Sequence, residues 1–214
     1  QSSAQNLYSV AYGNGRFVAV GYQAATQYGV LTSSDGTNWA TSSAFSATNW
    51  RCVAYGNGLF VAVASDGANR VMTSPDGKNW TARTVSISTW WAVAYGNGRF
   101  VAVSTNNNDI MYSSDGINWG YTTAPTAIKT WTAITFGNGR FVALAGASSL
   151  TDGAITSSDG ITWNKYNTPS NNGWSSVTYG NGLFVAVAPG CNLTPYNCVM
   201  TSPDGINWTL RTTP

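Results

Sequence analysis

The sequence predicts an all-β protein, a five-bladed β-propeller with four antiparallel strands in each blade. Three observations support this fold class. One motif recurs five times along the 214 residues, each copy divides into short strand-like runs separated by glycine-rich turns, and no stretch shows the sustained 3.6-residue hydrophobic period of an amphipathic helix. Repeat units of this length bury their apolar faces only against neighbouring units, so the five copies are expected to form one domain over residues 1–214.

Each unit carries two recurring phrases. The first has the form V-A-Y-G-N-G-R-F-V-A-V and occupies, with small changes, residues 10–20, 53–63, 93–103, 134–144 and 177–187. The second has the form S-S/P-D-G-x-N/T-W and ends at Trp39, Trp80, Trp119, Trp163 and Trp208. The Gly-Asn-Gly triplets follow one another at intervals of 40 to 43 residues, which predicts blades at about residues 6–45, 46–86, 87–126, 127–170 and 171–214.

The side chains of a unit predict the order of its elements. The run before Gly-Asn-Gly is rich in β-branched and aromatic residues and predicts the first strand. Gly-Asn-Gly predicts a tight hairpin turn to a second strand, F-V-A-V. A variable loop leads to a third strand, such as residues 71–74, and the Asp-Gly turn leads to a fourth strand that carries the tryptophan. The first two strands are apolar at consecutive positions, which indicates burial on both faces.

Five four-stranded sheets that are covered on both faces are typical of a propeller ring. An open solenoid needs polar caps at its ends, whereas the first and last units here are as apolar as the middle ones. We therefore expect a closed ring in which the first and fifth blades pack on one another. Every blade is expected to be complete in chain order, with no terminal strand exchanged between the first and last units.

The second phrase resembles the Asp-box, or BNR, repeat of sialidase-like β-propellers, and its five copies extend the resemblance over nearly the whole chain. The resemblance implies a turn between the third and fourth strands of each blade in which the aspartate has a structural role. Independently, an aspartate side chain can accept hydrogen bonds from turn amides, and the tryptophan can bury a large ring against the blade. The chain is also similar to non-catalytic five-bladed propeller lectins. The box aspartates are Asp35, Asp76, Asp115, Asp159 and Asp204.

The composition excludes several kinds of chemistry. The chain has no histidine and no glutamate, and charged residues make up only 8% of it. These absences exclude a histidine zinc site, Ser-His-Asp and Cys-His nucleophiles, and the Tyr-Glu nucleophile pair that the sialidase resemblance would imply. Ten scattered basic residues and a net charge of +2 do not predict nucleic-acid binding. No apolar run is long enough to insert into a membrane, and no cofactor or metal site is expected.

A glycosidase is the weakest functional alternative. Three aspartates lie outside the boxes, each shortly before the third strand of its own blade, namely Asp66, Asp109 and Asp152. A glycosidase needs two carboxyl groups roughly 5–10 Å apart across one sugar, whereas these three belong to different blades. The sequence therefore predicts a protein that is not an enzyme.

The edge of the propeller that carries the variable loops is the predicted binding face. In a four-stranded meander the loops after the second and fourth strands share one edge, and these are the loops that differ between units. Recognition residues are usually found on loops that a rigid scaffold holds. Four tryptophans that start the first strands are expected around the mouth of the axial channel, either as platforms for sugar rings or wedged between blades. The candidate glycan-binding residues are Trp50, Arg51, Trp90, Trp91, Trp131, Trp174, Tyr22, Tyr28, Asn107, Asp109 and Tyr196.

The cysteines bear on the location of the protein. Cys191 and Cys198 lie in one loop of the last unit. A disulfide between them would stabilise the fold by roughly 2–3 kcal/mol and would indicate an oxidising compartment. With Gln1 in place of an initiator methionine, this predicts a secreted, extracellular protein. Cys52 is expected to be a small buried residue without chemistry.

Two functional hypotheses follow. The leading one is a secreted, non-enzymatic carbohydrate-binding propeller, whose repeated weak sites act together on glycans or glycoconjugates. The alternative is a structural or adhesive module that contacts other proteins or its own copies through an uncharged surface rich in Asn, Ser and Thr. A net charge of +2 favours such self-association because it gives little repulsion between copies.

Overall fold

A computed structural model describes residues 6–22, 29–42, 49–127, 130–146, 153–189 and 197–213. Over these residues the chain forms twenty β-strands. The strands group into five sheets, and each sheet contains four consecutive strands that pair as an antiparallel meander. In this part of the chain no helix has the length and apolar character needed to cross a membrane. The predictions of an all-β fold and of four strands per sheet, with no strand exchanged between units, are confirmed.

The bounds of the strands follow the five units. The first sheet contains β1 (Asn6–Gly13), β2 (Arg16–Tyr22), β3 (Val30–Ser33) and β4 (Ala40–Thr41). The second contains β5 (Trp50–Gly56), β6 (Leu59–Ala64), β7 (Val71–Ser74) and β8 (Thr81–Arg83). The third contains β9 (Trp90–Gly96), β10 (Arg99–Ser104), β11 (Asp109–Ser113) and β12 (Gly120–Thr123). The fourth contains β13 (Trp131–Gly137), β14 (Arg140–Ala145), β15 (Ala154–Ser157) and β16 (Asn164–Tyr166). The fifth contains β17 (Ser176–Gly180), β18 (Leu183–Val187), β19 (Val199–Ser202) and β20 (Thr209–Arg211).

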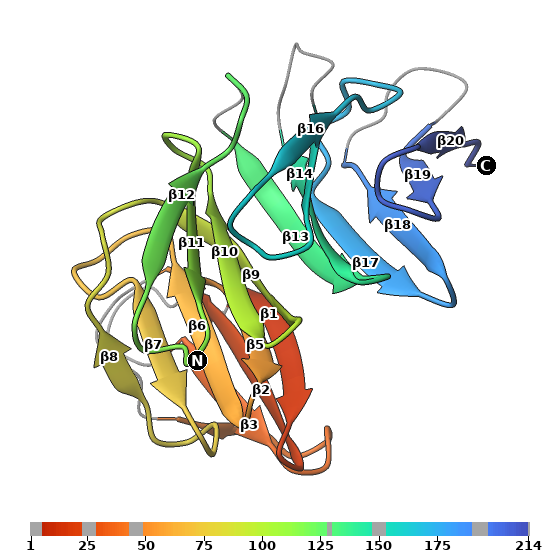
Figure 1. Ribbon diagram of the computed structural model, residues 1–214. Helices are drawn as coiled ribbons and strands as arrows, with labels where there is room; N and C mark the ends of the chain where they lie inside the picture. The colour runs from red at the N-terminus through yellow and green to blue at the C-terminus, as the bar shows by residue number, and fades with distance from the viewer. Residues whose placement is uncertain are drawn as a thin grey trace.

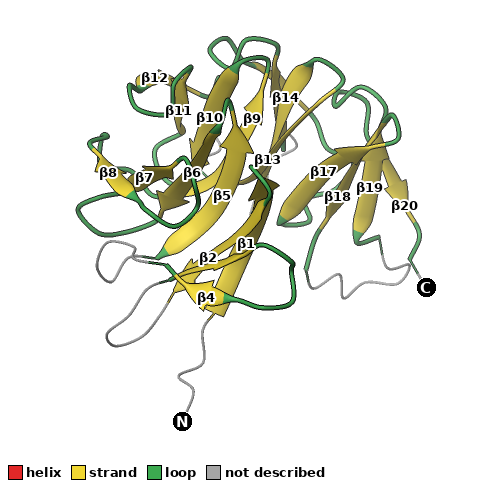
Figure 2. Ribbon diagram, turned by 90° about the horizontal axis from the view of Figure 1, so that it is seen from below, coloured by secondary structure: helices red, strands yellow, loops and turns green. Residues whose placement is uncertain are grey.

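The sheets follow one another around an axis, as propeller blades do (Figure 1). The first strand of each sheet is the innermost, and β1 packs on β5, β5 on β9, β9 on β13 and β13 on β17. Figure 2 shows the last sheet, β17 to β20, standing beside the fourth sheet at the end of this series. Four hydrophobic clusters fill the spaces between neighbouring sheets. The core therefore lies between the sheets, which explains why strands of the middle sheets are apolar on both faces.

The Gly-Asn-Gly turns form as the sequence predicts. In all five turns the asparagine has a φ of 46–48° and the glycine after it a φ of 69–77°. Two successive residues with positive φ define a type I′ hairpin turn, for which Asn-Gly is the preferred pair. The turn joins the first strand to the second in every sheet, so this hairpin prediction is confirmed.

The Ser-x-Asp-Gly segment also forms the same turn in each sheet, here called the aspartate turn. In the third sheet the Oδ1 atom of Asp115 accepts hydrogen bonds from the backbone amides of Ile117 and Asn118, both at 2.8 Å. The Asn118 side-chain amide donates to Oδ2 of Asp115 at 2.8 Å. The Ser113 hydroxyl donates to Oδ1 and accepts from the amide of Gly116. The carboxylate is therefore fully occupied within its own turn, in the structural role that the sequence predicts.

These hydrogen bonds lower the pKa of the turn aspartates. In Asp115 the backbone amide of Asn118 has the largest effect, followed by that of Ile117, and the pKa falls well below its ordinary value of 3.8. In Asp159 burial raises the pKa, but the amides of Thr162 and Ile161 outweigh it and bring the value to about 2. Charge-assisted hydrogen bonds favour the ionised form of a carboxyl group, so all five turns depend on charged aspartate.

Neighbouring sheets meet at four joints that share one construction. The ring before Gly-Asn-Gly in each following sheet lies against the first glycine of that triplet in the preceding sheet. A Cβ atom on Gly56 would lie only 2.0 Å from Cγ of Tyr95, so no other residue fits there without displacing the ring. The same contact recurs at Gly13, Gly96 and Gly137. In three joints the turn asparagine also donates to a backbone carbonyl in the next sheet's aspartate turn, at 3.1–3.2 Å.

The first and fifth sheets do not form a fifth joint. Apart from its own chain neighbours, no atom of the described residues lies within 4 Å of a Cβ built on Gly180, the counterpart of the glycines at the internal joints. Tyr12, whose ring would fill that place, is 60% exposed. Each internal joint buries the tryptophan that starts the following sheet, whereas the first unit has Leu7 at that position. The expected closed ring is therefore corrected to an open arc of five sheets. At the position where each internal joint buries a tryptophan, a closing joint would have only the smaller Leu7.

Candidate functional site

A cavity of about 470 Å³ lies on the axis, and all five innermost strands contribute to its wall. The wall is formed near the start of these strands, at the edge of the molecule that carries the variable loops. The sequence predicted recognition at this edge. We therefore take the axial cavity as the candidate binding site.

A β-bulge places one residue of each of the first four inner strands in this wall. In each of these sheets the first strand pairs with the second. The pairing shifts by one residue just after the Leu or Trp near the start of the first strand. A bulge leaves one residue without a partner and redirects its side chain. The extra residues, all of which line the cavity, are Tyr8, Arg51, Trp91 and Thr132. Equivalent positions of the repeat therefore present different side chains to a ligand.

Arg51 is held firmly within this set. Its guanidinium carbon lies 4.8 Å from the ring centre of Tyr8 and 4.2 Å from that of Trp91. The two rings come from β1 and β9, the strands that pack on either side of β5. The Nε atom donates a hydrogen bond to the Ser65 hydroxyl at 3.0 Å. Cation–π contacts on both sides and a bond at Nε fix the plane of the guanidinium group.

Arg51 also dominates the charge of the cavity. Among the described residues of the wall it is the sole charged side chain, and the remainder are apolar, aromatic or hydroxyl-bearing. Its two terminal nitrogens have no hydrogen-bond partner within the described ranges. An arginine whose terminal edge is free can bind a carboxylate through two parallel hydrogen bonds. The arrangement is therefore suited to an anionic group.

Cys52 lies beside Arg51 in the wall and is the free cysteine of the described part of the chain. Burial raises the pKa of its thiol. The thiol donates to the carbonyl of Val93 at 3.6 Å. A cysteine nucleophile reacts as the thiolate, which this environment disfavours. Cys52 was expected to be buried, whereas it is half-buried in the cavity wall.

The four tryptophans proposed as sugar platforms have a different place. They are 0–1% exposed, and each lies in a hydrophobic cluster with valine, leucine or isoleucine side chains of the preceding sheet. A buried indole offers no free face to a sugar, so the structural alternative describes them better. For Trp50, Trp90 and Trp131 the reason is geometric, because the bulge turns the following residue toward the axis and leaves the tryptophan between the sheets. The residues concerned are Trp50, Trp90, Trp131 and Trp174.

Tyr22, Asn107 and Asp109, the other candidate residues that the structure describes, lie outside the axial cavity. Tyr22 ends β2 with an exposed ring, and Asn107 is exposed in the loop before β11. Asp109 accepts a hydrogen bond from the Ser88 hydroxyl at 2.8 Å, and Asp66 accepts one from the backbone amide of Asn49 at 2.7 Å. These two carboxylates belong to different sheets and neither lines the cavity.

Several predictions fall on residues that the structure does not describe. These are Tyr28, Tyr196, Asp152 and Cys191. The disulfide between Cys191 and Cys198 therefore stays a prediction. Within the described ranges, no three side chains of His, Cys, Asp and Glu gather as a metal site.

The sequence analysis found two of the five cavity residues that share one position of the repeat and missed the other three. Tyr8, Thr132 and Ser175 occupy the same position of the repeat as Arg51 and Trp91, one residue after the leading Trp or Leu. This position is the most varied one in an otherwise uniform strand. Variation between units at one position could have identified all five residues together.

Comparisons with known proteins define the fold. No family model matches the chain, and no curated protein sequence matches it. Among solved structures, virginiamycin B lyase from Staphylococcus aureus is 12% identical, with a TM-score of 0.79 over 98% of this chain and 71% of that one. A structure described as YCF48 bound to D1 peptide is 15% identical, with a TM-score of 0.68 over 99% and 68%. A nidogen/laminin complex is 11% identical, with a TM-score of 0.68 over 92% and 76%.

These neighbours are β-propellers, and the five four-stranded sheets place this chain in the same class. At 11–15% identity the likeness extends to the fold alone. The neighbours include an enzyme as well as proteins described with a peptide or a protein partner, so the function must be argued from the site.

Proposed function

We propose that the protein is a non-catalytic binding module whose axial cavity takes a peptide segment by a carboxylate group, with Arg51 as the principal contact. The observation that carries this proposal is the guanidinium group of Arg51, fixed between Tyr8 and Trp91 in a cavity with no acidic side chain among the described residues of its wall. Because the group is already oriented, little conformational freedom is lost when a ligand binds.

The remainder of the wall suits a peptide. The hydroxyl-bearing residues Ser176 and Thr178 of β17 line the cavity on the far side from Arg51's own strand and are exposed. They can bond the amide groups of a backbone, while Tyr8 and Trp91 present aromatic rings in the same wall. A cavity of about 470 Å³ has room for a few residues of peptide.

The chemistry of the site favours binding over catalysis. The part of the wall that the structure describes contains no carboxylate that could act as a general base, and burial disfavours ionisation of its thiol, Cys52. The turn aspartates are occupied by their own amides. The description of YCF48 with D1 peptide and that of nidogen with laminin add support, because both concern propellers that bind a peptide or a protein.

Binding of two fluorescently labelled hexapeptide pools to the parent chain and to Arg51 variants tests this proposal. Both pools have random sequences without Asp or Glu. One pool has free C-terminal carboxylates, and the other has amidated C-termini. We expect the free-acid pool to bind more tightly by fluorescence polarisation. Arg51→Gln should weaken that binding by roughly 10- to 100-fold, the cost of a bidentate charged contact. Arg51→Lys should lie between, because a lysine cannot form the planar fork.

A matched control is Arg83→Gln, which removes the same charge from β8, where Arg83 donates to Thr73. This variant should bind both pools as the parent does. Equal binding of the two pools, or an Arg51→Gln protein with unchanged affinity, would contradict the role given to the carboxylate and to Arg51.

A carbohydrate ligand is the second candidate. Trp91, the hydroxyl groups of the wall, and the exposed Tyr22 and Asn107 at the variable-loop edge favour it, and an acidic sugar would offer Arg51 the same carboxylate. A glycan array with a haemagglutination assay distinguishes the two candidates. Multivalent binding that free sugar inhibits would favour the lectin hypothesis over the peptide hypothesis. An extracellular location, which rests on the expected disulfide, remains part of that second proposal.

A further inference from the structure

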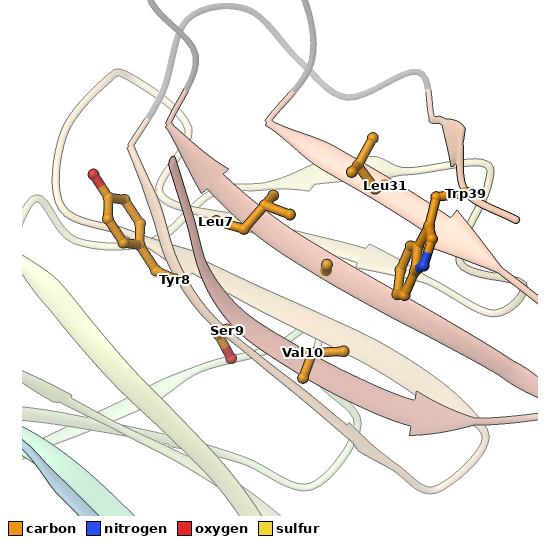
Figure 3. A pocket seen from close by; sticks show the side chains of 7 residues that line it. Leu7, Tyr8, Ser9, Val10, Leu31 and Trp39 are labelled. Carbon is orange, nitrogen blue, oxygen red and sulfur yellow. The ribbon is translucent and has the colours of Figure 1, made fainter. Parts of the chain in front are cut away.

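Each internal joint is a contact between two sheet faces. Within the described ranges, the first and the last sheet each have one such face that contacts no neighbouring sheet. The leading flank is the outer face of the first sheet and consists of Leu7, Val10, Tyr12, Leu31 and Trp39. An apolar hollow of about 550 Å³ lies on it, and Figure 3 shows Leu7, Val10, Leu31 and Trp39 along this face. The trailing flank is the opposite face of the fifth sheet and consists of Gly180, Leu183, Val185 and Val187.

Both flanks are exposed where the equivalent residues inside the arc are buried. Val10 is 61% exposed, whereas Val53 at the same position of the second unit is 5% exposed. On the trailing flank Val187 is 42% exposed, whereas Val63 of the second unit is fully buried. Large adjoining apolar faces of this kind mark interaction sites in soluble proteins.

The flanks are complementary because the repeat makes them so. Gly180 has an empty place where the internal joints hold an aromatic ring, and Tyr12 is an exposed ring with no such place. A second contact is also unmade. A Cβ on the turn glycine Gly77 would touch Val18 of the preceding sheet at 2.6 Å, whereas the atoms nearest to a Cβ on Gly36 belong to Phe17 of its own sheet, at 3.5 Å or more. Each flank therefore lacks what the other presents.

We propose that the trailing flank of one copy of this chain receives the leading flank of a second copy, in a head-to-tail joint built like the four inside each chain. The partner is a second copy because the same surfaces already form this joint four times within one molecule. Closure of the arc on itself would require each of the four close-packed joints to shift, which interiors of native density resist. A second copy requires no such shift.

The joint between copies is expected to be weaker than the internal ones. Each internal joint buries a tryptophan at the start of the following sheet, whereas the joint between copies would bury Leu7. Smaller buried apolar area gives weaker association, so the assembly should be reversible. Head-to-tail contacts use two different surfaces and can add further copies until they close.

Sedimentation velocity over roughly 1–500 µM protein tests the proposal, a range that covers micromolar association. The parent chain should form oligomers larger than a dimer as concentration rises. Tyr12→Arg disables the leading flank and Val187→Arg the trailing flank, so each variant alone should remain monomeric. An equal mixture of the two should form dimers only, because it contains one intact flank of each kind.

Ile87→Arg is the control, since Ile87 is 78% exposed and belongs to neither flank; this variant should associate as the parent does. A mixture that stays monomeric, or Ile87→Arg abolishing association, would overturn the proposal. So would a parent chain that is monomeric throughout while a Tyr12→Cys, Gly180→Cys double variant cross-links within one chain, because that result indicates closure of the arc on itself.

Discussion

The same short sequence forms the internal joints and the open flanks, but its side chains are buried in the joints and exposed on the flanks. The tetrapeptide Val-Ala-Tyr-Gly occurs in β1 and again in β5, yet its valine is 61% exposed as Val10 and 5% exposed as Val53. The turn that follows has closely similar φ angles in the two units. The comparison shows that local sequence sets the strand and its turn, whereas burial requires a neighbouring sheet.

Among the predicted changes, acid should lower the free energy of unfolding most, because it protonates the turn aspartates of all five sheets at once. These turns are the same in sheets that form internal joints and in sheets that carry an open flank. The pKa of each turn aspartate is lower in the folded chain than its ordinary 3.8, and that of Asp159 is about 2. A lowered folded pKa adds stability above the unfolded value, and this stability is lost as the pH falls through the folded value.

The free energy of unfolding should therefore be steady from about pH 7 to pH 5 and fall between about pH 4 and pH 2. Urea titrations followed by tryptophan fluorescence measure it. Asp35→Asn in the first sheet and Asp115→Asn in the third should reduce the pH dependence equally, because two backbone amides and an asparagine side chain bond each carboxylate within its own turn. Stability that does not change down to about pH 2 would contradict the role of these carboxylates.

A pair of glycine substitutions sharpens the comparison. Gly56→Ala places a Cβ 2.0 Å from Cγ of Tyr95, inside a closed joint, whereas Gly180→Ala meets nothing within 4 Å. Overpacking in a close-packed interior costs about 1–3 kcal/mol, so Gly56→Ala should lower the free energy of unfolding by about 3 kcal/mol. Gly180→Ala should change it by less than about 0.5 kcal/mol in dilute solution. Equal losses would show that the flank is occupied within a single chain.

A pair of valine substitutions gives a smaller contrast of the same kind. Val63→Ala removes two methyl groups from a fully buried site, whereas Val187→Ala removes them from the exposed trailing flank. The first should cost about 2 kcal/mol through lost burial and a residual cavity, and the second less than about 0.5 kcal/mol. Thermal unfolding at low protein concentration, where copies are separate, measures both. A large cost for Val187→Ala under these conditions would break the comparison.

Much of the fold could be predicted because its signals are local. Asn-Gly pairs favour positive φ at both positions, so the hairpins at Asn14 and its four counterparts follow from two residues. The aspartate turns follow from a side chain that bonds amides two and three residues ahead. The five copies of each phrase then fix the order of the sheets.

The candidate site was less predictable because it depends on a bulge. The sequence singled out both Trp90 and Trp91 but not which of them faces the axis. The pairing of β9 with β10 leaves Trp91 as the extra residue, so Trp91 lines the cavity and Trp90 is buried between sheets. Arg51 was found for its difference from the other units, but its contacts with Tyr8 and Trp91 join three sheets and have no signature within one unit.

The sequence by itself determined the strands, the turns and their repetition, since each rests on hydrogen bonds and backbone preferences that span only a few residues. The tertiary structure decided which identical residues are buried, which side chain each bulge turns to the axis, and that the first and last sheets stand apart. Those outcomes depend on contacts between sheets some forty residues apart in the chain. A sheet face makes such contacts only where a neighbouring sheet packs against it.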